Sequence, residues 1–248
     1  MANILQLGTL VVNGKAVSAP EYGVLENPGS KAPQIVDTQE GKAIKWVVVG
    51  GKLIADRCLV QHISYFDISN RILTGPRCTR RICLDGQEYI LRLPKVGKAP
   101  SDLPNEWDSA LDDVGESDSI WHWHRISFWG AEKTDDDDYP GYWALRGNNA
   151  PRRWIKHEPD VNSCCGWRPV LEPVSVEPSP ELIGQKVAVW YDQQIIYGKL
   201  DSYTAYDIYL SNAETAFLYG CERDAWYEYQ SVRRIVVDKT KIAALQRR

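Results

Sequence analysis

Four consecutive aspartates form the densest group of reactive side chains in the sequence: Asp135, Asp136, Asp137 and Asp138. They precede Tyr139-Pro140-Gly141, a combination of residues that is typical of a turn. Clustered carboxylates can coordinate calcium, but this run lacks the alternating acidic residues and the central glycine of a known calcium loop. The sequence therefore favours an acidic loop in solvent, and it leaves open a loop that recognises a basic partner.

Aromatic, amide and guanidinium side chains flank the acidic run. Guanidinium groups beside aromatic rings are typical of hot spots in protein interfaces and of platforms on which single-stranded nucleic acid stacks. We expect ligand contacts from Trp129, Tyr142, Asn148, Asn149, Arg152 and Arg153. For a second set the sequence favours a structural role: Arg146, Trp154, Trp167 and Arg168.

Two histidines, His122 and His124, alternate with tryptophans. On a β-strand both imidazoles would lie on one face, because side chains alternate between the faces of a strand. They could bind a metal with His157 or Cys164 as a third ligand. No spacing fixes those partners, so we favour a polar face opposite a tryptophan-rich core and expect no metal or other cofactor.

The sequence lacks the motifs of common enzymes: it has no nucleophile elbow, no phosphate-binding glycine loop and no dinucleotide fingerprint. Its first residues, MANILQLGTLVVNGK, lack the basic start and the cleavage site of a signal peptide. We therefore expect six reduced cysteines rather than disulfides. No apolar run approaches the roughly 20 residues of a membrane-spanning helix. These features predict a protein without enzymatic activity, located in the cytoplasm or in an assembled particle.

Charge is distributed unevenly along the chain, although the net charge is only -4. Residues 102–138 contain twelve acidic and two basic side chains, whereas residues 71–98 contain seven basic and two acidic ones. Two solvated faces of opposite sign would explain this pattern. A charged recognition surface is the alternative.

Patterns of β-branched residues predict a mainly β fold, with an α+β N-terminal domain. Residues 43–60 contain two β-branched runs around Gly50-Gly51, and residues 81–93 contain two runs around Asp85-Gly86. Such pairs supply the positive φ angles that a tight turn needs, so each segment is expected to form a hairpin.

Residues 101–114 combine a serine with helical apolar spacing, which predicts a short helix. The next strand is expected over residues 119–130. Proline-rich residues 170–181 are typical of an extended linker, and we place the boundary between two domains there. The predicted domains are residues 1–175 and 182–248, joined by residues 176–181.

The predicted C-terminal domain alternates with period two, as expected for a small barrel of five strands. The expected strands cover residues 182–192, 194–203, 206–214, 225–230 and 233–238. A helical signal appears only in the last turn, residues 240–248.

Several motifs of the N-terminal domain resemble a family of uncharacterised phage and prophage proteins. The matching segments are residues 53–57, 85–93, 105–108, 146–147, 152–154 and 166–172, which end in GWRPVLE. This ending is similar to the C-terminal edge of the C-type-lectin-like fold, which includes the variable proteins of diversity-generating retroelements and the formylglycine-generating enzymes. The resemblance implies ligand binding by exposed side chains on a rigid scaffold. Cys164-Cys165 is similar to the cysteine pair of those enzymes, but the rest of their active-site pattern is missing.

The C-terminal domain resembles an Sm-like domain. The matching residues are Gly184 and the segments 198–203, 206–213 and 233–237. Asp207 replaces the asparagine that contacts RNA bases in that family, and Arg233-Arg234 replaces its Arg-Gly pair. The resemblance implies a barrel that assembles into a homo-oligomer or docks a partner, and the departures argue against RNA binding.

Two functions follow from these observations. The first is a non-catalytic phage-type binding protein, whose loops between Trp129 and Cys165 recognise a macromolecular ligand while the barrel attaches or assembles it. The second is an intracellular inhibitor of a host defence complex, such as an anti-CRISPR protein, that acts through acidic mimicry of nucleic acid, or a regulator that binds RNA through the barrel. The sequence favours a protein partner, leaves nucleic acid open as the alternative, and indicates no membrane.

Overall fold

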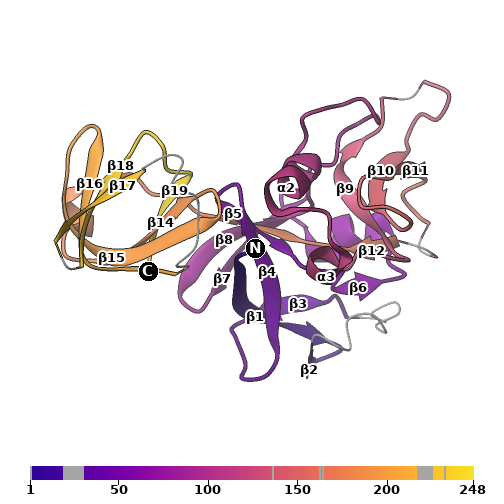
Figure 1. Ribbon diagram of the computed structural model, residues 1–248. Helices are drawn as coiled ribbons and strands as arrows, with labels where there is room; N and C mark the ends of the chain where they lie inside the picture. The colour runs from indigo at the N-terminus through magenta and orange to yellow at the C-terminus, as the bar shows by residue number, and fades with distance from the viewer. Residues whose placement is uncertain are drawn as a thin grey trace.

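The structure is a computed structural model that describes residues 2–18, 31–135, 137–161, 163, 165–216, 226–231 and 233–248. Strands account for 47% of the residues and helices for 11%, which confirms the prediction of a mainly β protein. The strands form three sheets of eight, five and six strands. Figure 1 shows the six-stranded sheet at one end of the molecule and the five-stranded sheet at the other.

The eight-stranded sheet contains both predicted hairpins. Its strands are β1 (Ile4–Val12), β2 (Lys15–Val17), β3 (Gln34–Val36), β4 (Ala43–Val49), β5 (Lys52–Ala55), β7 (Thr79–Leu84), β8 (Gln87–Arg92) and β13 (Val170–Pro173). Gly50 and Gly51 turn with φ angles of 56° and 68°, and Asp85 and Gly86 with 50° and 80°. Residues 170–173 do not belong to a linker as expected, because β13 pairs with both β5 and β8 inside the sheet.

The five-stranded sheet carries the loops of interest. Its strands are β6 (Val60–Gln61), β9 (Ser127–Lys133), β10 (Trp143–Gly147), β11 (Trp154–His157) and β12 (Cys165–Trp167). The helical elements of this half are α1 (Tyr65–Asp67), η2 (Ile68–Ile72), α2 (Glu106–Val114) and α3 (Asp118–Trp121). The predicted helix is confirmed as α2, but it starts later than expected because the Asn105 side chain caps it by accepting a hydrogen bond from the Asp108 N–H.

The strand expected over residues 119–130 is wrong in its first half. Residues 118–121 form helix α3, whose N-cap is Ser117, and His122 ends it with a left-handed φ of 43°. Strand β9 begins only at Ser127. His122 and His124 therefore do not lie side by side on one face of a strand.

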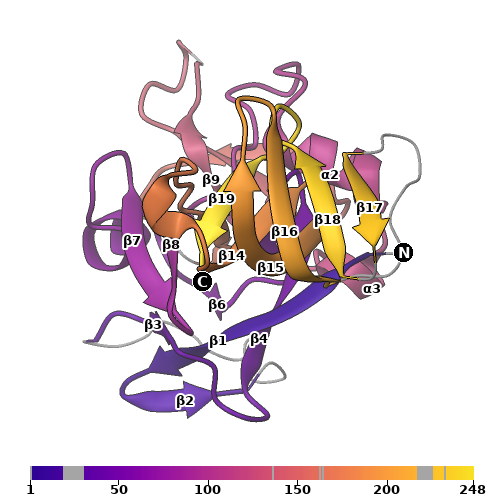
Figure 2. The same cartoon turned by 90° about the vertical axis from the view of Figure 1, so that its left-hand side faces the viewer.

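The C-terminal sheet has six strands rather than the five expected. They are β14 (Lys186–Tyr191), β15 (Gln194–Tyr203), β16 (Asp207–Thr215), β17 (Tyr227–Ser231), β18 (Arg234–Asp238) and β19 (Ala244–Arg247), preceded by the short helix η3 (Pro180–Leu182). Figure 2 shows these strands side by side across the near face of the molecule. The end of the chain forms β19 instead of a helical turn because it pairs with β14 and buries Leu245.

The C-terminal sheet packs directly against the eight-stranded sheet. The ring of Trp190 meets the ring of Tyr89 edge to face at 6.3 Å, and its indole N–H donates to Gln246 Oε1. Gln246 in turn donates to the backbone carbonyl of Glu88. The N–H of Gly51 donates to the carbonyl of Asp192 at 2.8 Å. Apolar and polar contacts thus join the two parts.

Gly51→Ala should weaken this junction. Gly51 adopts a positive φ, and a Cβ atom added there would collide with the Cβ of Ala243. Gly50→Ala is the matched control, since Gly50 also has a positive φ but its added Cβ would meet only the flexible end of Lys52 at 3.6 Å. We expect Gly50→Ala to cost about 1 kcal/mol and Gly51→Ala about 1–3 kcal/mol more, measured by urea unfolding. Equal unfolding midpoints for the two variants would contradict this account.

Candidate functional site

A groove lies between the β9–β10 loop and residues 98–100. It has a volume of about 690 Å³, and it is lined by Lys98, Ala99, Pro100, Asp135, Asp137, Asp138, Trp154 and Lys156. An adjoining hollow of about 630 Å³ shares three of these residues and extends along residues 131–134 to Pro140. We call this surface the loop groove.

Backbone hydrogen bonds hold the β9–β10 loop in place. The N–H of Thr134 donates to the carbonyl of Tyr142 at 2.9 Å, and the N–H of Tyr142 donates to the carbonyl of Tyr139. The Tyr142 hydroxyl donates to Glu158 Oε1 at 2.9 Å, and this bond raises the pKa of Tyr142. The loop therefore returns to the sheet at a fixed place and projects its aspartates.

Charged groups in the loop groove are only loosely neutralised. Lys98 Nζ lies 3.4 Å from Asp135 Oδ2, but more than half of each side chain is exposed, so the pair contributes little energy and can exchange. Asp137 is exposed and makes no ion pair within the described residues. The Asp137 carboxylate thus remains available to a cationic ligand.

One aromatic ring, that of Trp154, lines the loop groove, and the Tyr139 ring contacts a lysine of its lining. The Trp154 indole N–H donates to the carbonyl of Gly97 at 3.0 Å, which fixes the ring in the groove wall. Lys156 Nζ lies 3.8 Å from the centre of the Tyr139 ring. Lys98 and Lys156 could not be assigned to this site from the sequence, because their approach to the loop depends on contacts between distant segments. Trp154, expected to be structural, is both anchored and part of the groove.

The turn of residues 148–153 lies at the other end of β10, so the structure does not bring it together with Tyr142. Arg152 is engaged within the chain: its guanidinium contacts Asp112 at 2.6 Å and Glu116 at 2.5 Å. It therefore ties the turn to α2 rather than projecting toward a ligand. Asn149 and Arg153 are exposed, and Asn148 is half-buried.

The prediction of an exposed Trp129 is wrong. Its side chain is fully buried, and its indole N–H donates to the carbonyl of Ile63 at 2.8 Å. An alternating pattern predicts that every second residue of a strand faces solvent. In β9, residues 127–130 are all buried, so no such exposed position exists there. Asp136 lies outside the described residues.

The predicted structural role of Arg146 and Arg168 is confirmed by their burial. Arg146 donates to Asp108 Oδ2 at 2.6 Å and to the carbonyl of Val96 at 2.9 Å. Arg168 donates to the carbonyl of Ala55 at 2.9 Å. Trp167 is also fully buried.

The described residues contain no group of three His, Cys, Asp or Glu side chains that could hold a metal ion. His122 instead lies 3.0 Å from the Arg57 guanidinium, and the backbone N–H of His124 donates to Asp118 Oδ1. Among the described cysteines, Cys58, Cys78 and Cys83 are free thiols. Cys164, named as a possible ligand, lies outside the described residues.

Comparison of the chain with protein-family models, curated proteins and solved structures found no match. Within the part of the chain that the structure describes, no helix is long and apolar enough to cross a membrane.

Proposed function

We propose that this chain is a non-catalytic binding protein that holds a basic segment of a protein partner in the loop groove. The observation that carries the proposal is the exposed Asp137 in a groove walled by the anchored ring of Trp154, with the exposed Tyr139 ring held next to Lys156. Carboxylates attract a cation over long distances and set the rate of association. Aromatic faces then stabilise arginine or lysine at short range.

One cation–π contact of this kind already exists within the chain. Lys156 lies over the Tyr139 ring, so that ring accepts a cation in its present orientation. A partner arginine could stack beside Trp154 and exchange with Lys98 for Asp135, since the Lys98–Asp135 pair is exposed. No rearrangement of β9–β11 is needed for this binding mode.

The resemblances noted in the sequence extend the proposal. We infer a phage-encoded protein in which a lectin-like scaffold displays the loop groove, within the host cell or in the phage particle. The Sm-like C-terminal sheet would attach or assemble it. The contact between Trp190 and Tyr89 supports this view, because it fixes the sheet relative to the rest of the scaffold.

Neutralising the loop should weaken partner binding. The triple variant D135N/D137N/D138N removes three exposed charges, for which we expect roughly a 10- to 100-fold loss of affinity at low salt. The partner would be captured from host lysate treated with nuclease, identified by mass spectrometry, and its affinity measured by biolayer interferometry.

The control is E40Q/E181Q/E228Q, which makes the same change in net charge at exposed positions outside the groove. This variant should bind as the unmodified chain does. If the loop variant and the control bind equally well at every salt concentration, the loop groove is not the interface.

A second candidate is the inhibitor of a host defence complex through acidic mimicry. Burial and the nearby carboxylates of Asp192 and Asp112 raise the pKa of Asp113. Asp113, Asp112 and Asp192 thus form an acidic cluster at the C-terminal end of α2, in which Asp112 also contacts Arg152 at 2.6 Å. Partner binding lost in D113N/D192N but retained in the loop variant would favour this function.

A further inference from the structure

The eight-stranded sheet curls so that two of its edges approach each other. At one end, Thr38 donates through its backbone N–H and its hydroxyl to the Asp85 carboxylate, at 2.9 and 2.6 Å. The backbone N–H of Asp85 donates to Asp37 Oδ1 at 2.8 Å. Beyond these bonds β3 and β7 separate, and within the described residues they do not pair with each other.

A groove of about 350 Å³ opens between these two strands. It is lined by residues 33–37, residues 80–83, Ile72, Leu91 and Trp167. We call it the edge groove. It is separate from the loop groove, because the two grooves have no lining residue in common.

The wall formed by β7 can accept another strand. Within the described residues β7 pairs only with β8, with Leu84 opposite Gln87 across the two-residue turn. In such a hairpin the pair next to the turn is hydrogen-bonded, so alternate residues bond within the hairpin. The backbone N–H and C=O groups of Arg81 and Cys83 therefore point away from β8, toward the open edge.

The floor of the edge groove is apolar and contains one unsatisfied donor. Ile35 and Ile82 are half-buried, and Leu91 is buried. The Trp167 indole is fully buried, and its Nε1 has no hydrogen-bond partner. The other five fully buried tryptophans each donate the indole N–H to an oxygen, as Trp46 and Trp107 do. A buried N–H without an acceptor is unfavourable, so Trp167 is an exception among the buried tryptophans at this groove.

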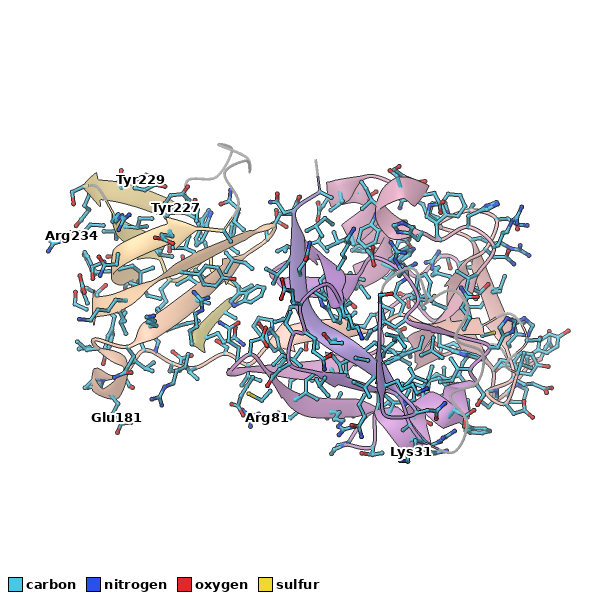
Figure 3. The ribbon with its side chains drawn as sticks, turned by 90° about the horizontal axis from the view of Figure 1, so that it is seen from below. Lys31, Arg81, Glu181, Tyr227, Tyr229 and Arg234 are labelled. Carbon is cyan, nitrogen blue, oxygen red and sulfur yellow. The ribbon has the colours of Figure 1, made fainter. Side chains whose placement is uncertain are left out.

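The rim of the edge groove is positively charged. Arg80 makes no ion pair with any described residue, and Arg81 contacts Glu88 at 3.1 Å through two side chains that are more than half exposed. Figure 3 shows Arg81 and Lys31 along the same edge of the molecule. Asp37, the acidic residue in the lining, is engaged with the backbone of Asp85.

We propose that the edge groove binds an extended, acidic peptide segment of a partner protein by strand addition to β7. The peptide backbone pairs with Arg81 and Cys83, as in other complexes that extend a sheet. Alternate side chains of the peptide enter the apolar floor, and its carboxylates pair with Arg80 and Arg81.

The test uses two fluorescein-labelled peptides, acetyl-(Glu-Val)4-amide and acetyl-(Lys-Val)4-amide. They share the strand-forming pattern and differ in charge, and binding is read by fluorescence anisotropy. The protein is labelled with ¹⁵N in its tryptophan indoles, and the Trp167 resonance is assigned with Trp167→Phe. We expect the Glu-Val peptide to bind at least tenfold more tightly and to shift the indole resonance of Trp167, which lines the edge groove.

The charge-reversal variant R80E/R81E should invert the preference between the peptides. Its matched control is R233E/R234E, which reverses an adjacent exposed arginine pair on the C-terminal sheet, where Arg234 is marked in Figure 3. This control should bind as the unmodified chain does.

Equal binding of both peptides, or an unmoved Trp167 resonance at about 1 mM Glu-Val peptide, would overturn the proposal. Self-association of the chain that R80E/R81E abolishes would show a second copy as the occupant, and would overturn the assignment to a partner. D135N/D137N/D138N should bind the Glu-Val peptide normally, which separates this test from that of the loop groove.

Discussion

Replacing Arg168 by methionine should lower the free energy of unfolding by about 3–5 kcal/mol. The Arg168 side chain is fully buried and donates to the carbonyls of Ala55 and Trp121 at 2.9 and 2.6 Å. Its guanidinium carbon lies 4.7 Å from the centre of the Phe128 ring. Methionine keeps much of the volume but leaves both carbonyls without a donor in a buried place.

Burial lowers the pKa of Arg168, while the nearby Cys58 and Asp56 act in the opposite direction. Burial also raises the pKa of the Cys58 thiol, so this thiol is not an activated nucleophile. Arg153→Met is the control, because Arg153 is exposed. Urea unfolding, monitored by circular dichroism, gives the free energy of unfolding of both variants. A loss below about 1 kcal/mol for Arg168→Met would show that the carbonyls find other donors.

Acidification should destabilise the fold through Glu106, by about 3 kcal/mol between pH 5 and pH 2. Burial alone would raise the pKa of Glu106, but hydrogen bonds and charge from Arg92, with Lys52 nearby, hold it at about 2. Arg92 Nη2 lies 2.6 Å from Glu106 Oε1, and both side chains are nearly inaccessible.

The sign follows from comparing the two states. The unfolded chain binds the Glu106 proton at a higher pH than the folded chain does, so the stabilisation is complete above the unfolded pKa. It is lost as the pH falls toward the folded pKa. Glu106→Gln should cost about 3–5 kcal/mol at pH 7 and flatten the acid limb of the stability curve.

Glu88→Gln is the matched control for this experiment. Glu88 pairs with Arg81 at 3.1 Å, but both side chains are more than half exposed, so its removal should change stability by less than about 1 kcal/mol at any pH. Urea midpoints at several pH values measure both variants. An acid limb of unchanged slope in Glu106→Gln would assign the pH dependence to other carboxylates.

Local turn chemistry was the part of the fold that the sequence predicted best. Gly50-Gly51 and Asp85-Gly86 each lie between two β-branched runs, and the positive φ angles they need are rare in other residues. The strand predicted at residues 119–121 was wrong for a related reason, since these residues belong to α3. There the Ser117 side chain accepts a hydrogen bond from Ser119 N, and Asp118 accepts one from His124 N. These side-chain caps overrode the alternating pattern that predicted a strand.

The candidate site was predictable only where it depends on one segment. The acidic run could be identified as a loop, because no core can accommodate it. The positions of Lys98 and Lys156 required the complete fold. Lys98 lies 37 positions before Asp135 in the sequence, and Lys156 lies 18 positions after Asp138. Trp129 was misassigned because an indole suits both a core and an interface.

The place of β13 in the eight-stranded sheet has a consequence for synthesis of the protein. The β7–β8 hairpin joins the rest of that sheet through β13, which lies between β5 and β8. While a ribosome is still translating the intervening residues, β5 and β8 each present an open edge to the surrounding medium. The sheet closes only when residues 170–173 leave the exit tunnel, so both edges stay open until then.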